Sequence, residues 1–243
     1  MEDLRTTLIK HGFRFKKQFG QNFISDTNLL KSIVAASGIG GEDTAVEIGC
    51  GAGTLTRALA EVAKRVYAFD IDADLKPVLA ETLSGLDNVE VIFRDFNKLD
   101  LPAFEREIGA YTVVANLPYY ITSPIVMKLL EERLPIEHIT VMVQKEAADR
   151  LSAAPGTRAA GAVTYAVHYY AAPRTLFTVQ PGSFYPPPKV TSAVIQLRLH
   201  EAPPVTPRSA EAMFRVIRAA FSQRRKTAAN AASAGLHLPL SLI

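Results

Sequence analysis

The chain has 243 residues, and its 48% hydrophobic and 21% charged content is ordinary for a globular protein and excludes overall disorder. No apolar run approaches ~18 residues and no signal-peptide pattern opens the chain, so we expect no membrane association. The single Cys50 cannot form an internal disulfide, which favours a reducing, cytoplasmic setting.

The net charge of +3 is unevenly distributed. Residues 1–22 contain five Lys or Arg residues against two acidic ones, and residues 200–243 contain six against two, so the residues between them carry about −4. Basic ends around an acidic body favour a polyanion bound at the periphery, although a solvated surface with a chance excess is equally compatible. The candidate phosphate contacts are Arg14, Lys16, Lys17, Lys189, Arg224, Arg225 and Lys226.

Helices and strands are predicted to alternate from about residue 28 onward. A Ser25–Asp26 cap begins a helix that runs to Ala36, and residues 54–64 have helical spacing. Further apolar runs predict strands at 44–48, 65–70, 89–93, 111–115 and 138–143, and two more near 165–170 and 192–199 that pair antiparallel. Right-handed crossovers make this an α/β fold, a doubly wound, Rossmann-like, mostly parallel sheet with an antiparallel edge.

A proline-rich segment at 201–207 interrupts this pattern and predicts a linker. The spacing of Met213, Phe214, Ile217 and Phe221 then predicts one helix with an apolar stripe. We therefore expect a sheet domain over residues 1–200 and a helical subdomain over 201–243, truncated before it can close a bundle.

A glycine loop follows the first strand, in the pattern Glu47-x-Gly49-x-Gly51-x-Gly53. Alternating glycines let the backbone turn sharply and let a ligand approach its main-chain atoms. The pattern differs from the dinucleotide motif G-x-G-x-x-G. S-adenosylmethionine has no phosphate and carries cationic groups, so a carboxylate such as Glu47 suits it, and a glycine-rich turn without a ligand is the minor alternative.

Acidic residues close the next strands. Asp70 ends the second strand, where a carboxylate can accept hydrogen bonds from both ribose hydroxyls. Asp95 follows the third and can accept a hydrogen bond from the adenine amine of the cofactor, with Phe96 beside the ring. Strand alternation points Asp72 elsewhere. Together these residues predict a cofactor site at the carboxyl edge of the sheet.

Asn116 ends the fourth strand, at the same edge. Its side-chain oxygen and the Leu117 carbonyl can accept hydrogen bonds from one exocyclic amine, and Tyr119 offers a stacking face. The proline-stiffened loop that begins at Phe184 offers a second aromatic face, or else a buried Phe at the start of an edge strand. An adenine amine is inaccessible in a stacked helix, so the target base is expected to be flipped out or unpaired.

Five segments occur in one order: residues 17–23, the glycine loop, 116–122, 184–190 and 221–227. Together they closely resemble the ribosomal RNA adenine dimethyltransferase family over residues 10–233. The resemblance implies two methyl groups on each of two adjacent adenosines, in a hairpin loop near the 3′ end of 16S rRNA in the small ribosomal subunit. It also implies that Asn22 and Ile24 contact the cofactor, and that the basic residues named above bind RNA.

The family commonly has Glu where this chain has Asp70, which shortens the reach of the carboxylate by one methylene. The alternatives are a large-subunit rRNA adenine methylase of the macrolide-resistance type, a non-catalytic nucleic-acid-binding relative and a small-molecule methyltransferase. The basic ends disfavour the last. The five His residues have no metal-ligand spacing, so we predict no metal site, and a monomer is the default expectation.

Overall fold

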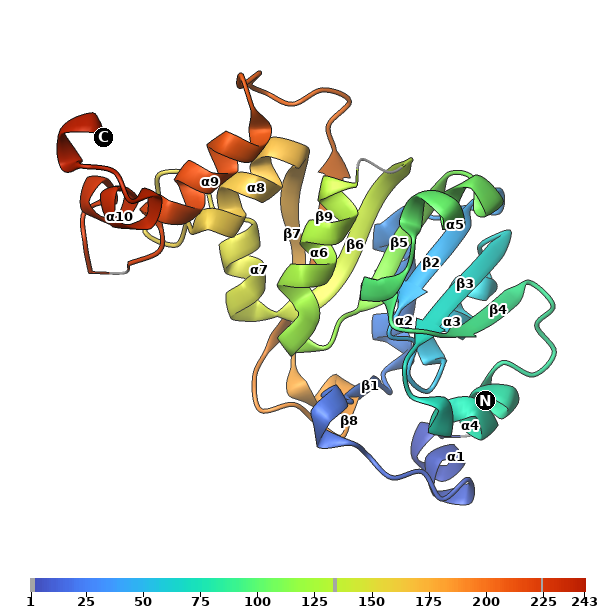
Figure 1. Cartoon of the computed structure of the whole chain (residues 1–243). Coiled ribbons are helices and arrows are strands. Elements are labelled where there is room, and N and C mark those ends of the chain that lie inside the picture. Colours follow the sequence, from blue (N-terminus) through green and yellow to red (C-terminus); the bar gives the residue numbers. More distant parts are fainter. Residues whose placement is uncertain (1–2, 133–134, 224) are drawn as a thin grey trace.

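The computed structural model describes residues 3–132, 135–223 and 225–243 (Figure 1). Its main sheet has seven strands in the order β4-β3-β2-β5-β6-β9-β7. Five strands are parallel, and β9 is antiparallel to both β6 and β7. The strands are β2 (Thr44–Ile48), β3 (Arg65–Asp70), β4 (Val89–Phe93), β5 (Tyr111–Asn116), β6 (Ile136–Gln144), β7 (Ala171–Val179) and β9 (Ser192–Leu199).

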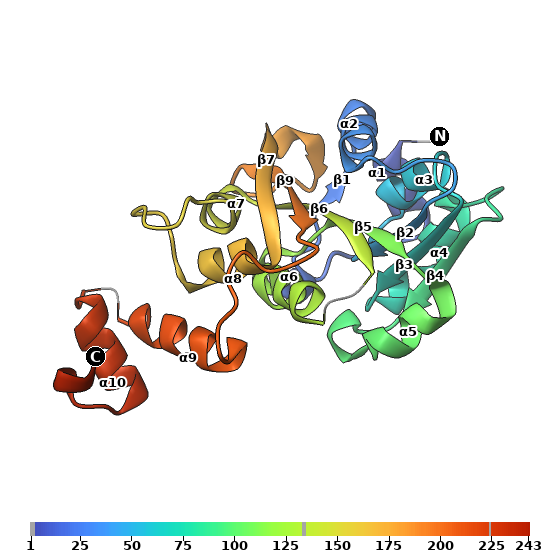
Figure 2. The same cartoon turned by 90° about the horizontal axis from the view of Figure 1, so that it is seen from above.

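Helices cover both faces of this sheet, as the doubly wound prediction requires (Figure 2). In β5, Val113 and Ala115 pack in one hydrophobic cluster, whereas Val114 packs in the other, because successive strand side chains point to opposite faces. One face packs against α2 (Thr27–Ser37), α3 (Thr54–Ala60) and α4 (Lys76–Thr82), and the other against α5 (Leu101–Ile108), α6 (Thr122–Glu131), α7 (Lys145–Leu151) and α8 (Ala162–Tyr170).

The strand order reverses between β2 and β5. From β2 the chain proceeds outward to β3 and β4, and then returns to place β5 on the other side of β2. Loops that leave the carboxyl ends of these two strands therefore diverge and leave a crevice between them, which is where open α/β sheets bind ligands.

The amino-terminal segment closes this edge of the sheet. Helix α1 (Leu4–Lys10) packs against α4, and a two-residue strand β1 (Phe23–Ile24) pairs antiparallel with β8 (Phe184–Tyr185). The Thr54 hydroxyl donates to the Ile24 carbonyl at 2.9 Å, which ties β1 to the start of α3.

One predicted strand is wrong. Residues 165–170 form the end of α8, and the edge strand is β7, which pairs antiparallel with β9. Short aromatic and β-branched runs suit strand and helix alike, so periodicity alone does not separate them. The Thr164 side chain accepts the Gly161 backbone N–H at 2.9 Å and so fixes the start of the helix.

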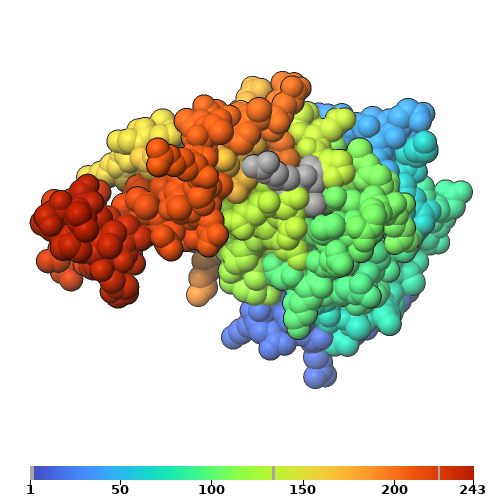
Figure 3. All heavy atoms as spheres, turned by 45° about the horizontal axis from the view of Figure 1, so that its top comes forward, coloured from blue at the N-terminus to red at the C-terminus, as the bar shows by residue number. Residues whose placement is uncertain are grey.

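The carboxy-terminal segment projects from the sheet body (Figure 3). Helix α9 (Ala210–Ala220) confirms the predicted apolar stripe, and Phe214 packs on Tyr169 and Tyr170 of α8 with ring centroids 5.2 and 5.7 Å away. Helix α10 (Ala228–Leu236), which the sequence did not predict, packs against α9. Among the described residues, no helix is long and apolar enough to span a bilayer.

Candidate active site

A pocket lies at the carboxyl edge of the sheet, over the point where the strand order reverses. Its walls come from the amino-terminal segment and from the loops after β2, β3, β4 and β5. The predicted site residues that line it are Asn22, Gly49, Gly51, Asp70, Asp95, Phe96, Asn116, Leu117 and Tyr119. The structure thus brings most of the predicted site into one cavity.

The glycine loop leaves β2 with a sharp turn. Gly49 and Gly51 have φ angles of 77° and 54°, in the left-handed region that side chains disfavour. The backbone N–H groups of Gly49 and Cys50 both donate to the Phe69 carbonyl, at 2.8 and 2.9 Å, so the loop is pinned to the end of β3. A Cβ on Gly49 would lie 3.5 Å from Pro118, which brings the loop against the segment after β5.

Asp70 lies between the glycine loop and the loop that follows β3. One carboxylate oxygen accepts the Gly51 N–H at 2.8 Å, and the other accepts the Asp72 N–H at 2.9 Å. Burial raises the pKa of Asp70, and these backbone hydrogen bonds oppose that shift. The carboxylate is thus held rigidly at the pocket wall, with lone pairs left for ligand hydroxyls.

Asp95 and Phe96 form the wall after β4. The Asp95 carboxylate accepts the Asn97 N–H at 3.0 Å, and the Phe96 ring packs edge-on against Phe69 at a centroid distance of 5.3 Å. The Lys128 ammonium of α6 donates to the Phe96, Asn97 and Leu99 carbonyls at 3.3, 2.7 and 2.8 Å. One lysine therefore holds this wall against the helix that follows the Asn116 segment.

Asn116 ends β5 and reaches the amino-terminal segment. Its side-chain nitrogen donates to the Asn22 carbonyl at 3.0 Å, so its side-chain oxygen is left to accept a hydrogen bond from a ligand. The next residue, Leu117, donates its backbone N–H to the Met142 carbonyl at 3.0 Å, which fixes the peptide. The site thus has a rigid acceptor on an otherwise apolar wall.

Two tyrosines follow. The Tyr119 hydroxyl lies 2.7 Å from the Ser192 hydroxyl of β9, which fixes the plane of the Tyr119 ring. Tyr120 also lines the pocket and is 55% exposed, and its ring lies 3.7 Å from the position of a Cβ on Gly20. Two aromatic faces therefore meet at the pocket, both from the same segment.

Three predicted site residues do not line the pocket. Phe184 is 4% exposed in the core, with its strand paired to β1, so its ring offers no second stacking face here. Ile24 is buried beside it. Glu47 is 1% exposed and accepts the Thr56 hydroxyl at 2.5 Å, because at the end of β2 its side chain points into the protein.

Most of the predicted phosphate contacts are exposed to solvent. Arg14, Lys17, Lys189, Arg225 and Lys226 are exposed, and Arg224 lies outside the described residues. Lys16 differs, because its ammonium lies 2.5 Å from Asp72 and 2.6 Å from Asp74.

The sequence did not indicate that Tyr120 and Gln21 line the pocket, or that Asp72 binds the amino-terminal segment. Tyr120 directly follows Tyr119, and this pair of aromatic residues could have predicted a second stacking face. Gln21 and Asp72 meet only through the folding of distant segments, so no local spacing marks them. Asp72 lies in the loop after β3 and does not line the pocket, which agrees with the expectation that it points elsewhere, and its side chain binds Lys16 and Gln21.

S-adenosylmethionine fits these residues. Asp70 and Asp95 supply acceptors at two strand ends, Phe96 supplies an aromatic wall, and Gly49 and Gly51 line the pocket. Basic side chains that would suit a pyrophosphate are sparse in the pocket, where Arg94 is the one among the described lining residues.

Comparison with known proteins gives the family. Residues 12–237 match the family model described as ribosomal RNA adenine dimethylase. A ribosomal RNA small subunit methyltransferase A from Geobacillus thermodenitrificans is 52% identical over 227 residues, which covers 92% of this chain and 78% of that protein. One of the same name from Alkaliphilus metalliredigens is 46% identical over 230 residues, with 93% and 80% covered.

Solved structures agree. A dimethyladenosine transferase from Plasmodium falciparum is 31% identical with a TM-score of 0.74, covering 86% of this chain and 74% of that one. The 23S rRNA methyltransferase ErmE is 28% identical with a TM-score of 0.71, covering 86% and 83%. The chain therefore belongs to the ribosomal RNA adenine dimethylase family and is an S-adenosylmethionine-dependent methyltransferase with the Rossmann-like class I fold.

Proposed function

We propose that this enzyme dimethylates the exocyclic amines of two adjacent adenosines in a hairpin loop near the 3′ end of small-subunit rRNA. The observation that supports this most directly is the Asn116 corner. Its amide nitrogen is committed to the Asn22 carbonyl at 3.0 Å, which presents the amide oxygen as a hydrogen-bond acceptor beside the Leu117 peptide.

The reaction does not require a strong general base before the amine attacks. The amine lone pair of adenine is delocalised into the ring, and hydrogen bonds from the amine to the Asn116 oxygen and the Leu117 carbonyl favour a pyramidal nitrogen. The cofactor supplies an electrophilic methyl group, and the attacking amine is neutral, so its proton can leave later. Positioning and electrostatics then account for most of the rate.

The aromatic residues hold the base. Tyr119, oriented by Ser192, and the exposed Tyr120 offer faces for a flipped adenine, and stacking is insensitive to the neighbouring sequence. We assign the cofactor to Asp70, Asp95, Phe96 and the glycine loop, which line the same pocket as Asn116. The methyl donor and its acceptor then meet at the Asn116 oxygen.

The choice of the small subunit rests on relatives. Chains 46–52% identical to this one carry the small-subunit name, whereas the 23S enzyme ErmE is 28% identical. We further propose that the enzyme acts as a monomer in the cytoplasm, where ribosomal subunits assemble in bacteria.

Methyl transfer tests the acceptor site. With labelled S-adenosylmethionine and immature small subunits, Asn116→Ala is expected to reduce incorporation by about 100-fold, because the amine loses its positioning acceptor. Asn28→Ala, on the exposed surface of α2, is the matched control and should leave incorporation unchanged. Equal incorporation by the Asn116 variant would refute the assignment.

Mass spectrometry of rRNA tests the target. A strain that lacks the gene should lose dimethyladenosine from small-subunit rRNA and regain it on complementation. Loss from large-subunit rRNA alone would support the macrolide-resistance type of methylase instead. No loss from either RNA, together with RNA binding by the purified protein, would indicate the non-catalytic relative.

A further inference from the structure

The amino-terminal arm, which we define as residues 13–24, forms one wall of the pocket. Phe19–Phe23 all line it, and the Asn22 carbonyl accepts from Asn116. The arm is anchored at its far end, where β1 pairs with β8. Its near end is held by polar contacts with the loop after β3.

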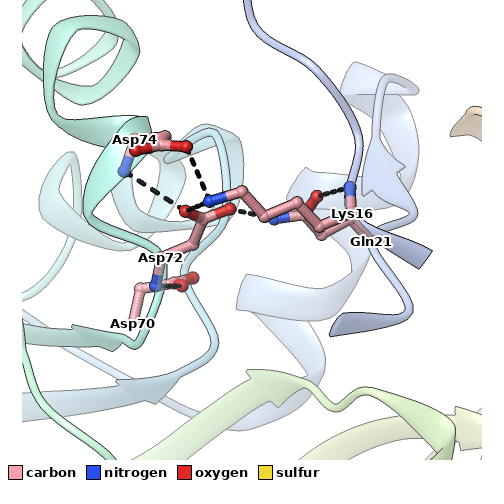
Figure 4. Close-up of polar contacts among 5 residues, drawn as sticks. All are labelled: Lys16, Gln21, Asp70, Asp72 and Asp74. Carbon is pink, nitrogen blue, oxygen red and sulfur yellow. Dashed lines mark hydrogen bonds and ion pairs between the residues drawn. The ribbon is translucent and has the colours of Figure 1, made fainter. Parts of the chain in front are cut away.

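Those contacts converge on Asp72. This carboxylate is only 2% exposed, although the residue lies in the loop after β3 (Figure 4). One of its oxygens accepts the Lys16 ammonium at 2.5 Å, and the other accepts the Gln21 amide at 2.7 Å. Both oxygens of one acid are therefore bound by the arm.

The arm residues are also bonded to each other. The Gln21 side-chain oxygen accepts the Lys16 backbone N–H at 2.8 Å, and the Lys16 ammonium also pairs with Asp74 at 2.6 Å (Figure 4). The contacts fix a short loop of the arm against Asp72 as a unit, and we call this set of contacts the latch.

Asp72 is linked in turn to the cofactor side of the pocket. Its backbone N–H donates to Asp70 at 2.9 Å (Figure 4). The other Asp70 oxygen accepts the Gly51 N–H. The same short loop thus fixes the arm through its side chain and the assigned ribose acid through its backbone. A displacement of the arm that moves Asp72 therefore also moves a hydrogen-bond donor of Asp70.

The contacts of the latch can be replaced by contacts with water. Lys16 and Gln21 of the arm bind the two carboxylate oxygens of Asp72, so an opening of the arm would replace these contacts by contacts of Asp72 and Lys16 with water. Charged pairs of this kind give little net stability because hydration in the open state offsets their attraction. Residues 19–23 of the arm line the pocket, so the way the arm is held bears directly on how a cofactor is bound there.

We propose that Asp72 is a positioning residue that couples closure of the arm, through Lys16 and Gln21, to cofactor binding. The inference rests on the cofactor placement proposed above. It assigns Lys16 to the arm closure, in place of the phosphate contact that the sequence suggested. By linkage, the factor by which arm closure strengthens cofactor binding equals the factor by which bound cofactor favours arm closure, so a change that opens the arm weakens cofactor binding.

The sharpest variant is Gln21→Glu. It retains the side-chain oxygen that accepts the Lys16 N–H but places a second carboxylate against Asp72, so the arm is expected to open. Binding of S-adenosylhomocysteine by calorimetry should weaken about 10-fold, and hydrogen exchange of arm amides should increase in the free protein. Asp72→Asn should act in the same direction, and Lys16→Arg should be nearly normal where Lys16→Met is not.

The control is Glu42→Gln, which removes an exposed carboxylate whose partner Lys64 lies 3.5 Å away, outside the pocket. It should match the wild type in affinity and arm exchange. In methyl transfer, the latch variants should raise KM for S-adenosylmethionine while kcat at saturating cofactor is unchanged, a split that general destabilisation would not produce.

Affinity and arm exchange within twofold of the wild type in both Gln21→Glu and Lys16→Met would overturn the proposal, as would a loss of kcat with KM unchanged. Both arm variants change partly exposed side chains, so they remain informative if Asp72→Asn does not fold. Cofactor binding and exchange are measured without RNA. These measurements can therefore refute the latch while the proposed rRNA target stands, and the rRNA target can be refuted while the latch stands.

Discussion

Glu47 combines the motif position of a cofactor ligand with the surroundings of a core residue. Burial raises its pKa to about 8, the charge of Asp70 adds to the shift, and the Thr56 hydroxyl opposes it. In the free protein at neutral pH this side chain therefore carries a proton most of the time. The free carboxylate expected beside a cationic cofactor is not the form that the structure favours.

This shift makes stability depend on pH. The pKa in the folded state lies above the ordinary value of 4.5, so the folded protein binds the extra proton between pH 4.5 and about 8. The stabilisation is complete below that window and is lost as pH rises through it, with a slope of at most about 1.4 kcal/mol per pH unit. Glu47→Gln keeps an acceptor for Thr56 and removes the titration.

Urea unfolding at pH 6 and pH 8 measures the effect. The free energy of unfolding of the wild type should fall relative to that of Glu47→Gln as pH rises between these values. Parallel pH profiles of the two proteins would show that Glu47 is ionised in the folded state throughout this range.

At the scale of elements, the Asp95 wall depends on α6. Lys128 is the donor that joins the carbonyls of Phe96, Asn97 and Leu99, and α6 begins just after the Tyr119–Tyr120 segment. The cofactor side and the acceptor side of the pocket are therefore cross-linked by one helix. A shift of α6 on binding of a base would reach Asp95 through this lysine.

Lys128→Met tests that link. The variant keeps the aliphatic stem but leaves three carbonyls without their charged donor, so the free energy of unfolding should fall by about 1–3 kcal/mol. S-adenosylhomocysteine affinity should fall several-fold in calorimetry at a temperature where the protein is folded. Lys31→Met, on the exposed face of α2, is the control, and an unchanged affinity in the Lys128 variant would mean that the wall is held by other contacts.

The strands also show how much of the fold and of the site can be predicted from the sequence. Strands β2 to β6 were predictable because each is a short run rich in β-branched and aromatic residues, and the position of the pocket followed because their carboxyl ends share one edge. Asp70, Asp95 and Asn116 are placed by that rule alone. The partners of Lys16 and Gln21 were not predictable, since contacts between an arm and a distant loop leave no periodic signal.

At the scale of the whole molecule, the α9–α10 pair projects from the sheet body, and Phe214 and Phe221 pack on α8 (Figure 3). Its interhelical turn carries Arg225 and Lys226, both exposed. These two residues do not line the pocket, and we propose that they bind RNA phosphates outside it.

Salt dependence of RNA binding tests that grip. Each phosphate contact contributes about 0.7–0.9 to the slope of log affinity against log salt, so Arg225→Gln with Lys226→Gln should reduce the slope by about 1.5. Affinity for S-adenosylhomocysteine should not change. The pair Lys31→Gln and Lys64→Gln removes the same charge elsewhere, and an equal loss of slope in it would mean that only net charge matters.

The glycine loop has one more consequence. A Cβ added to Gly51 would meet the ring of Phe23 at 2.7 Å, so the space left by the missing side chain is filled by the protein itself. Positions 23 and 51 therefore behave as a single steric unit despite their distance in sequence. A larger residue at position 51 would therefore require a smaller one at position 23, and a motif glycine usually attributed to the ligand is here required by an aromatic ring of the same chain.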